Sequence, residues 1–223
     1  MKVSIIVPTF NEEKTIKEVL ERCKPYGDEI LVVSAKKSTD RTKEIAEEMG
    51  FRTVIDNGKG KGDGIRVGLE HAKHEIIVFI DADGSHIPED IPLLSNPIKE
   101  GKADMVIASR FMGGSEELHG TFNKFLRIFF SYAIAQIINW RFSTAIGDTQ
   151  NGFRAIKKEV GKDIDLKANI FDIETEMVMK CYKKGYKVLE VPSRELKRKH
   201  GESGISLGKM GWVYAWRVFI NLW

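Results

Sequence analysis

Short apolar runs rich in β-branched residues alternate with amphipathic segments through the first half of the chain. The apolar runs predict strands at Val3–Pro8, Glu29–Ser34, Phe51–Ile55, Glu75–Ile80 and Ala103–Ala108. The amphipathic segments predict helices over Asn11–Cys23, Ser38–Met49 and Ile65–Lys73, and from Pro88 onward. Repeated β-α units build a parallel sheet with right-handed crossovers. The expected fold class is therefore α/β, with a mostly parallel central sheet flanked by helices.

The second half of the chain is less regular. It predicts helices over Thr121–Trp140 and Ile173–Lys184 and strands at Phe153–Ile156 and Tyr186–Val191. The strand at Phe153–Ile156 is expected at an edge of the sheet. No internal repeat and no low-complexity linker separates the two halves.

Bulk composition limits the class of protein. The 223 residues are 42% hydrophobic and 30% charged, which fits one globular α/β domain with at most a short appendage. The net charge of +3 is too small to indicate nucleic acid as a bulk partner. Residues 194–200 form a local basic cluster, which fits either a solvated surface segment or a contact with an anion or a membrane surface.

Cysteine usage and hydropathy bear on the compartment. Cys23 and Cys181 stand far apart and outside any metal-ligand spacing, so two free thiols in a reducing, cytoplasmic compartment are expected. The chain opens on the strand-like run Val3–Val7, without the flanks or length of a signal peptide. No stretch reaches the roughly 18 consecutive apolar residues that a membrane-spanning helix needs.

Polar residues gather where the predicted strands end. Ligands of open α/β sheets bind at the carboxyl ends of the strands, which points to Pro8-Thr9, Ser34, Asp81-Ala82-Asp83 and Ser109-Arg110. Asp81 and Asp83 follow a nearly continuous apolar strand, where a charged pair is costly unless it serves a ligand. Two carboxylates on one face favour Mg²⁺ or Mn²⁺, whose coordination shell substrate phosphates share.

A glycine-rich cationic turn, Gly58–Gly62, precedes the third predicted helix. Its glycines allow backbone amides to approach an anion, and the N-terminus of a helix favours phosphate. The turn does not match the P-loop pattern, which needs four residues before its final Gly-Lys. It fits either a contact with nucleotide phosphates or a mobile surface loop.

Seven short motifs occur in one order along the chain. They are Pro8-Thr9-Phe10-Asn11-Glu12-Glu13, Ser38-Thr39-Asp40-Arg41-Thr42, Gly60-Lys61-Gly62, Asp81-Ala82-Asp83, Ala108-Ser109-Arg110-Phe111, Asp148-Thr149-Gln150-Asn151-Gly152-Phe153-Arg154 and Glu190-Val191-Pro192. With these motifs the chain resembles the family 2 glycosyltransferases over nearly its whole length. The later motifs are similar to the branch that includes dolichyl-phosphate mannose synthases and dolichyl-phosphate glucosyltransferases. The resemblance implies a GT-A fold and a metal-dependent hexosyltransferase that uses GDP-mannose or UDP-glucose.

The resemblance also implies roles for single residues. The nucleotide-binding residues would be Pro8, Thr9, Asn11, Glu12, Ser34, Lys61, Asp81 and Asp83. Asp81 and Asp83 would hold Mg²⁺ or Mn²⁺, with Asp83 the more direct ligand. The acceptor-binding residues would be Arg110, Arg127, Ser131, Gln150, Arg198 and Ser203, and the catalytic residues Asp83, Asp148 and Arg110. Arg127 and Ser131 stand four residues apart on the long predicted helix, and hence on one face of it.

Three positions depart from the family pattern. The family usually carries an acidic residue after the second strand to recognise the base, and Ser34-Ala35-Lys36-Lys37 stands there instead. Ser85 occupies a position that is often glutamine in this branch, and Gly204 one that is commonly lysine. The first departure leaves the identity of the nucleotide open.

The acceptor decides which chemistry the site needs. A phosphate acceptor is ionised near neutral pH, so it needs positioning and charge balance more than a general base. A hydroxyl acceptor needs a base, and Asp148, Asp172 and Glu174 are the candidates. Arginines in motif positions favour a phosphate, because the guanidinium offers a fork of donors. The expected reaction is direct displacement at the anomeric carbon, with inversion.

The chain is expected to form a GT-A domain over residues 1–207, with a nucleotide-binding half at about 1–110 and an acceptor half at about 111–207. Residues 208–223 form an amphipathic aromatic segment in which tryptophans stand beside Lys209 and Arg217. Aromatic and basic residues together suit a membrane interface, so peripheral contact with the cytoplasmic face of a membrane that carries a polyprenyl-phosphate acceptor is expected. Core packing or a contact within a homo-oligomer is the alternative.

Other functions stay open on the sequence alone. A glycosyltransferase that acts on a hydroxyl acceptor fits the same nucleotide-binding half. A non-catalytic nucleotide-sugar-binding homologue fits the altered segment Ser34–Lys37. A sugar nucleotidyltransferase fits less well, because Pro8-Thr9-Phe10-Asn11 follows the first strand where that class carries a glycine-rich, arginine-containing loop.

Overall fold

The computed structural model describes residues 1–116, 122–200 and 207–222. The strands are β1 (Val3–Thr9), β2 (Glu29–Ser34), β3 (Arg52–Ile55), β4 (Ile76–Phe79), β5 (Met105–Ser109), β6 (Arg154–Lys157) and β7 (Val188–Pro192). The helices are α1 (Ile16–Cys23), α2 (Thr42–Glu48), α3 (Lys61–His71), α4 (Ile91–Lys99), α5 (Arg110–Gly113), α6 (Phe122–Phe142), α7 (Lys158–Asp163), α8 (Ile173–Lys183) and α9 (Leu207–Leu222). Short 3-10 turns over Lys24–Tyr26 and Pro88–Asp90 join α1 to β2 and lead into α4.

The strands form one mixed sheet in the order β3-β2-β1-β4-β6-β5-β7. Only β6 runs antiparallel to its neighbours, and every other pair is parallel. The strands β1, β4 and β5 are apolar along almost their whole length because helices cover both faces of the sheet. The prediction of a mostly parallel α/β fold is confirmed.

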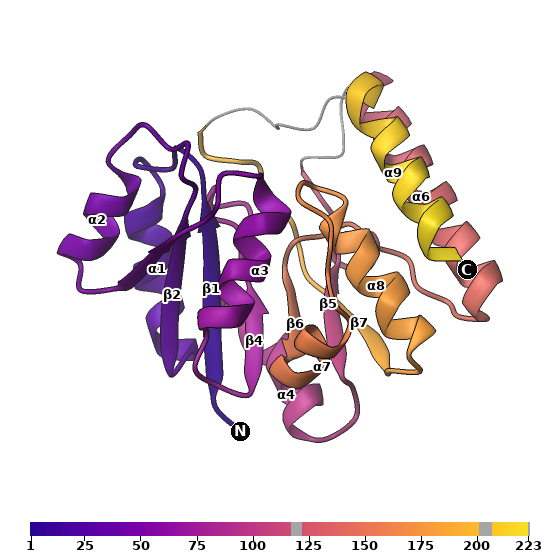
Figure 1. The fold of residues 1–223 in the computed structure, drawn as a ribbon, viewed down its shortest axis with the longest axis horizontal. Coiled ribbons are helices and arrows are strands. Elements are labelled where there is room, and N and C mark those ends of the chain that lie inside the picture. The colour runs from indigo at the N-terminus through magenta and orange to yellow at the C-terminus, as the bar shows by residue number, and fades with distance from the viewer. Residues whose placement is uncertain (117–121, 201–206, 223) are drawn as a thin grey trace.

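The helices divide between the two faces (Figure 1). The core on one face joins α1, α2 and α4 to residues such as Ile5, Val32 and Val106 of the strands. The core on the other face joins α3, α7 and α8 to residues such as Ile6 and Ile107. Alternate residues of one strand therefore serve opposite layers, and the sheet lies between two helical layers.

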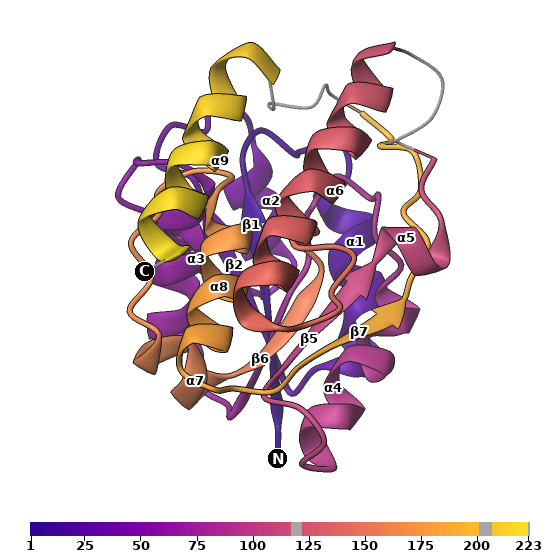
Figure 2. The same cartoon turned by 90° about the vertical axis from the view of Figure 1, so that its right-hand side faces the viewer.

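The helices α6 and α9 form an outer pair beside α8 (Figures 1 and 2). Arg141 of α6 donates through Nε to the carbonyl oxygen of Leu222 at the end of α9, over 2.7 Å. No described helix is long and apolar enough to cross a membrane. As far as it is described, the segment 208–223 belongs to α9, which packs against α6 and α8.

Two sequence predictions about elements are corrected. The strand predicted at an edge lies in the centre of the sheet as β6, between β4 and β5, because this chain segment returns antiparallel into the gap between them. The first helix begins at Ile16 rather than Asn11. Asn11 adopts a left-handed conformation, with φ 57°, and its side-chain oxygen accepts from the Ser38 hydroxyl and the Thr39 amide instead.

The third helix begins at Lys61, four residues earlier than predicted. The glycine-rich segment is thus partly helical and not a separate loop. A Cβ atom on Gly62 would stand 2.5 Å from the carbonyl oxygen of Ala168, so only glycine allows this first turn to lie against the backbone before α8. Close packing of two backbones explains the glycine there without any ligand.

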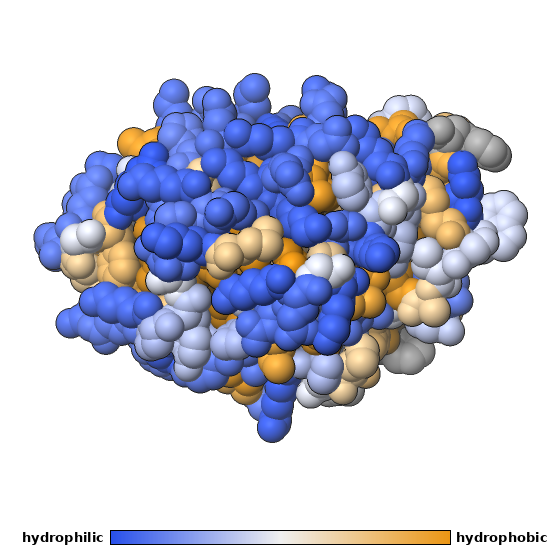
Figure 3. Space-filling model, turned by 90° about the horizontal axis from the view of Figure 1, so that it is seen from below, coloured by the Kyte–Doolittle hydropathy of each residue, from blue (hydrophilic) through white to orange (hydrophobic). Residues whose placement is uncertain are grey.

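The carboxyl ends of the parallel strands lie together at one edge of the sheet. Figure 3 shows the opposite face, near the amino ends of these strands, covered mainly by hydrophilic residues. The cavity described next lies at the carboxyl ends, where the strand-end rule predicted ligand binding.

Candidate active site

One cavity of about 500 Å³ opens at the carboxyl ends of the strands. Residues that follow five different strands contribute to its wall, among them Phe10, Ala35, Asp56, Asp81 and Arg110. Of the residues predicted to bind ligands, it is lined by Pro8, Thr9, Glu12, Lys61, Asp81, Asp83, Arg110, Gln150 and Arg198. The fold thus brings together residues that are up to 190 positions apart in sequence, from Pro8 to Arg198.

Lys61 joins two acidic residues at the centre of the cavity. Its Nζ lies 2.8 Å from Oδ1 of Asp81 and 3.0 Å from Oε1 of Glu174, which belongs to the first turn of α8. Burial alone would lower the pKa of Lys61, but the two carboxylates outweigh it and raise the pKa above its ordinary value. Burial would raise the pKa of Asp81, and Lys61 holds it well below its ordinary value instead.

The backbone of the Asp148–Arg154 motif approaches this pair closely. A Cβ atom on Gly152 would stand 2.8 Å from Nζ of Lys61 and 2.9 Å from Oδ2 of Asp81. A side chain at position 152 would therefore displace the ion pair. Gly152 therefore leaves the space that the ion pair of Lys61 and Asp81 occupies.

Asp83 is buried and held on both carboxylate oxygens. Its Oδ1 accepts from the amide and the hydroxyl of Ser85, and its Oδ2 lies 3.1 Å from Nη1 of Arg198. The segment that carries Arg198 also follows this loop through its backbone, since the Leu196 amide donates to the carbonyl of Ser85 over 2.8 Å. Part of the basic cluster at 194–200 therefore closes over the Asp-Ala-Asp motif.

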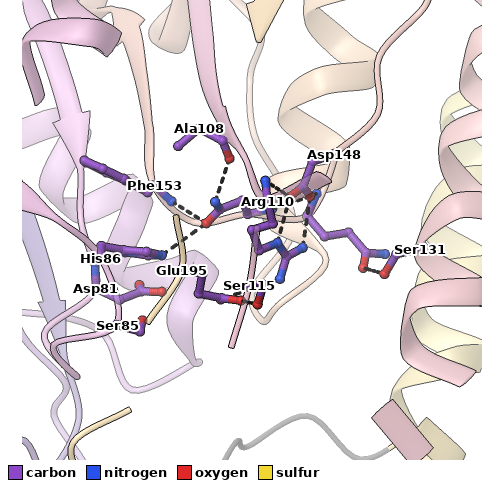
Figure 4. Close-up of polar contacts among 12 residues, drawn as sticks. Asp81, Ser85, His86, Ala108, Arg110, Ser115, Ser131, Asp148, Phe153 and Glu195 are labelled. Carbon is purple, nitrogen blue, oxygen red and sulfur yellow. Dashed lines mark hydrogen bonds and ion pairs between the residues drawn. The ribbon is translucent and has the colours of Figure 1, made fainter. Parts of the chain in front are cut away.

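His86 connects two of the motifs. Its Nδ1 lies 3.3 Å from the Asp81 amide and its Nε2 lies 3.1 Å from Oδ1 of Asn151. Asn151 donates from Nδ2 to the carbonyl of Ala108, which fixes its amide so that Oδ1 faces His86 (Figure 4). A neutral ring with hydrogen on Nε2 satisfies both contacts, and the ring also stacks on Phe153, with centroids 5.1 Å apart.

Arg110 and Asp148 form a buried bidentate pair (Figure 4). The Arg110 Nε and Nη2 donate to the two carboxylate oxygens of Asp148 over 2.7 and 2.9 Å. Burial would raise the pKa of Asp148, but Arg110 outweighs it and holds the pKa below its ordinary value. Glu195 lies 3.7 Å from Nη1 of Arg110 and also accepts from the Ser115 hydroxyl.

Gln150 and Ser131, two of the residues predicted to bind the acceptor, contact each other. The Ser131 hydroxyl on α6 donates to Oε1 of Gln150 over 2.6 Å. The structure thus connects the long helix to the Asp148–Arg154 motif. The side chain of Arg127 and all of Ser203, the two other residues predicted there, lie outside the described part of the chain.

Two predicted nucleotide-binding residues are not among those that line the cavity. Asn11 holds the loop at Ser38 and Thr39, and Ser34 is buried at the end of β2. Their proposed contacts with nucleotide remain predictions. Sequence reasoning singled out neither Asp56, His86, Glu195 nor Tyr214, which all line the cavity. Only Asp56 carried a readable signal, since it directly follows a predicted strand.

Glu12 is an acidic residue of the cavity whose pKa is shifted upward. Burial, followed by the negative charge of Asp83, raises its pKa from 4.5 to about 7. Its side chain accepts from the Thr15 hydroxyl over 3.1 Å. The cavity therefore holds one carboxyl group that titrates near neutral pH.

The donor set fits a divalent cation that shares its ligands with a bound diphosphate. Asp81 and Asp83 present carboxylate oxygens at one strand end, which suits Mg²⁺ or Mn²⁺. Within the described residues, no group of three or more His, Cys, Asp or Glu side chains is arranged to hold a metal by protein ligands alone. Phosphate oxygens and water would have to supply the remaining ligand positions.

Comparison with known proteins assigns the family. The model of the glycosyl transferase family 2 matches residues 4–161. The chain belongs to this family. It is 34% identical to the dolichol-phosphate mannosyltransferase of Pyrococcus furiosus, over 98% of this chain and 63% of that protein. It is 30% identical to the undecaprenyl-phosphate mannosyltransferase of Micrococcus luteus, over 95% of this chain and 90% of that protein.

Some relatives are considerably longer. The glycosyltransferase AglJ of Haloferax volcanii is 32% identical over 89% of this chain, yet the match spans only 64% of AglJ. The resemblance to family 2 glycosyltransferases seen in the motifs is confirmed, and membership of the family supports a hexosyltransferase.

Solved structures support the fold. Glucosyl-3-phosphoglycerate synthase of Mycobacterium tuberculosis, in complex with Mn²⁺, UDP-glucose and phosphoglyceric acid, superposes with a TM-score of 0.78. The similarity covers 99% of this chain and 79% of that one, at 22% sequence identity. The predicted GT-A fold is confirmed.

Proposed function

We propose that this family 2 glycosyltransferase moves a hexose from a nucleotide sugar to the phosphate of a polyprenyl phosphate. The names of the relatives from Pyrococcus furiosus and Micrococcus luteus support a lipid phosphate as acceptor. The Mn²⁺ and UDP-glucose bound by the synthase of Mycobacterium tuberculosis support a metal and a nucleotide sugar. The donor sugar is mannose or glucose.

The ion pairs of the three bases named from the sequence, Asp148, Asp172 and Glu174, carry the proposal. Asp148 is paired with Arg110, Glu174 with Lys61, and Asp172 with Arg217, whose Nε lies 2.6 Å from Oδ2 of Asp172. Each carboxylate lies within 3.0 Å of a lysine or arginine nitrogen, and its side chain is at most 3% exposed. A hydroxyl acceptor needs a base that is free to take a proton, whereas an ionised phosphate does not.

The residues of the cavity divide the remaining work. Asp81 and Asp83 would hold the divalent cation, which when bound neutralises charge on the diphosphate leaving group. Lys61, Arg110 and Arg198 contribute cations to the wall for the phosphates of donor and acceptor. An oxygen of the acceptor phosphate forms the bond to the anomeric carbon, while the bond from that carbon to the diphosphate breaks on the opposite face, with inversion.

An exposed apolar surface on α6 and α9 supports a bilayer location for the acceptor. Its residues are Phe129, Phe130, Tyr132, Ile137 and Trp140 on α6, and Trp216, Phe219 and Ile220 on α9, each at least 41% exposed. The two helices lie beside one another at one side of the molecule (Figure 2). Aromatic residues are favoured at the interface between bilayer and water, so we propose peripheral contact through this surface, called here the α6–α9 face.

A hydroxyl acceptor is the second candidate, and Glu195 favours it. Glu195 lines the cavity and its nearest cation, Nη1 of Arg110, is 3.7 Å away. Its carboxylate also accepts from the Ser115 hydroxyl but has no closer cation among the described residues, so it is a candidate to accept a proton from a hydroxyl.

An acceptor panel tests the proposal. The purified chain is incubated with Mg²⁺ or Mn²⁺, with GDP-mannose or UDP-glucose, and with a polyprenyl phosphate or the matching polyprenol. We expect a polyprenyl-phosphate sugar of inverted configuration, no product from the polyprenol, and loss of turnover in EDTA. Asp83→Asn should lower kcat/KM by about a hundredfold or more.

Asp165→Asn is the matched control, because Asp165 is exposed and its φ of 48° suits asparagine. It should leave kcat/KM unchanged. Transfer to the polyprenol alone would replace the proposal with the hydroxyl-acceptor function. A product of retained configuration would contradict direct displacement, and the absence of turnover with every pair would contradict the proposed function as a whole.

A further inference from the structure

The end of the cavity that lies over β2 lacks the acid expected there. Ser34-Ala35-Lys36-Lys37 follows β2, and Ala35 lines the wall. The neighbouring strand supplies a carboxylate in its place. Asp56 directly follows β3, and its amide donates to the carbonyl of Ser34 over 3.0 Å. The pairing of β2 with β3 thus continues one residue further and puts Asp56 beside the substituted segment.

The two oxygens of Asp56 have different surroundings. Oδ1 accepts from the amides of Lys36 and Gly58, each over 2.8 Å. No group in the described part of the chain donates to Oδ2. The residue is only 6% exposed, yet it lines the cavity. A buried carboxylate is therefore fixed through one oxygen, and its other oxygen is available to a ligand.

Gly64 shows which part of the cavity Oδ2 faces. A Cβ atom added to Gly64 would stand 3.7 Å from Oδ2 of Asp56, 3.7 Å from Cγ1 of Val33 and 4.0 Å from Cβ of Pro8. These are ordinary van der Waals distances. Pro8, Val33, Gly64 and Asp56 all line the cavity and converge on one recess. Apolar groups of Pro8 and Val33 stand beside the carboxylate in this recess, which suits a flat heterocycle with one polar edge.

A carboxylate oxygen only accepts hydrogen bonds. Uracil and guanine both present a ring N–H beside a carbonyl, at N3 and N1 respectively. Cytosine and adenine present a ring nitrogen lone pair at the equivalent place, next to an amino group. The carboxylate repels that lone pair, although it accepts from the amino group.

From this geometry we infer that Asp56 recognises the nucleobase and selects donors whose base is uracil or guanine over those with cytosine or adenine. The inference rests on the nucleotide-sugar donor of the proposed function, and it assigns to the end of β3 the role that the family pattern placed after β2. The uncommitted oxygen Oδ2 accepts the ring N–H, while the amides of Lys36 and Gly58 hold Oδ1 in place.

Binding of nucleoside diphosphates tests this without any transfer reaction. Titration calorimetry of the full chain in Mg²⁺ compares UDP, GDP, CDP and ADP. We expect the affinity for UDP or GDP to exceed that for CDP and ADP by about tenfold or more. The separate UDP and GDP measurements identify which of the two bases the recess takes.

Asp56→Asn reverses the polarity at Oδ2 with little change in shape. The amides of Lys36 and Gly58 both require an acceptor, so the amide oxygen of the variant takes the place of Oδ1 and its NH₂ group that of Oδ2. The NH₂ group of the variant then faces the ring N–H of uracil or guanine, and two donors cannot form a hydrogen bond with each other. Affinity for the preferred diphosphate should fall by about tenfold or more, while CDP and ADP bind unchanged or more tightly.

Gly64→Ala is the second variant, because its methyl group fills the recess without a clash inside the protein. It should fold and should weaken all four diphosphates together, whereas Asp165→Asn should weaken none. Equal affinities in the unchanged protein, or an equal loss for all four in Asp56→Asn, would overturn the inference and leave the proposed function standing. Selective binding without transfer to any acceptor would overturn the proposed function and leave the inference.

Discussion

The acidic residues that line the cavity or lie beside it differ in whether they have a close partner of opposite charge. Asp81, Asp83 and Asp148 each lie within 3.1 Å of a lysine or arginine nitrogen. Glu12 accepts from the Thr15 hydroxyl over 3.1 Å and lies near the negative charge of Asp83. At the scale of the residue, Glu12 is thus the one of these four acids whose ionised form the fold disfavours.

Glu12 should make the protein less stable as the pH rises from about 4.5 to about 7. The folded state keeps its proton up to about pH 7, while the unfolded chain releases it near the ordinary value of 4.5. The free energy of unfolding therefore falls between these values and the loss is complete above about pH 7. Glu12→Gln should be more stable than the unchanged protein at pH 8 by about 1–2 kcal/mol, after allowance for solvent screening, and nearly equal at pH 5.

Urea unfolding at both pH values, without nucleotide or metal, measures this difference. Glu21→Gln is the control, because Glu21 is exposed on α1 and away from Asp83. The same difference between Glu12→Gln and the unchanged protein at pH 5 and pH 8 would contradict the prediction.

Single residues were predictable from sequence where a strand-end rule or a motif pointed at them. Asp81, Asp83 and Arg110 follow strands and do line the cavity. The contact between Asp83 and Arg198 was not predictable in this way, because 114 residues separate the two and no local pattern pairs them. A role for Asp56 was not predicted, because the family pattern places the acidic residue after β2. That β3 lies next to β2 is a property of the folded sheet.

At the scale of elements, α9 is fastened to the start of α8. Arg217 pairs with Asp172 over 2.6 Å and lies 3.3 Å from Glu176, while the Tyr214 hydroxyl donates to the carbonyl of Phe171 over 2.6 Å. Phe171 and Tyr214 both line the cavity. The last helix of the chain therefore helps to build the wall of the site as well as the α6–α9 face.

Removing Arg217 should loosen this connection. Asp172 is 2% exposed, so Arg217→Met leaves a buried carboxylate without its cation and should lower the free energy of unfolding by about 2–4 kcal/mol. Adding Asp172→Asn should restore part of the loss, because the uncompensated charge is gone. Arg41→Met, at an exposed pair with Glu48, should cost less than about 1 kcal/mol.

Chemical denaturation of the four proteins gives these values. A loss in Arg217→Met no greater than that in Arg41→Met would show that α9 is not held through this pair.

The elements themselves were mostly predictable, because period-2 and period-3.6 apolar patterns persist in the buried strands and helices. The ends of these strands and helices were less predictable. The start of α3 at Lys61 depends on the close approach of Gly62 to Ala168, and the start of α1 depends on the loop contacts of Asn11. Both are tertiary contacts that override local preference. The position of β6 depends on its partners and not on its own four residues.

At the scale of the whole molecule, the cavity and the α6–α9 face share the same helices. Ser131 of α6 contacts Gln150 in the cavity wall, while Phe129 and Phe130 nearby on that helix are more than half exposed. The side chains of α6 thus link the candidate acceptor site to the surface proposed to meet the bilayer.

Vesicle binding tests this face. The double variant Trp216→Ala/Phe219→Ala removes two side chains that are more than half exposed and stack on each other, so it should fold normally. Its partition onto vesicles of anionic phospholipid, measured by cosedimentation, should fall by about tenfold or more. Without the two aromatic side chains the protein buries less apolar surface in the bilayer. Leu93→Ala, exposed on α4, should bind as the unchanged protein does. Equal partition of all three would assign the α6–α9 face to another partner.

The central position of β6 has a consequence for synthesis of the chain. Its partners β4 and β5 are complete by residue 109, but the strand that joins them begins only at Arg154. A nascent chain that has left the ribosome to residue 150 therefore carries two apolar strands whose inner edges lack a partner. Such edges are where newly made chains associate wrongly. For this protein, the inner edges of β4 and β5 stay without their shared partner until residues 154–157 have been made.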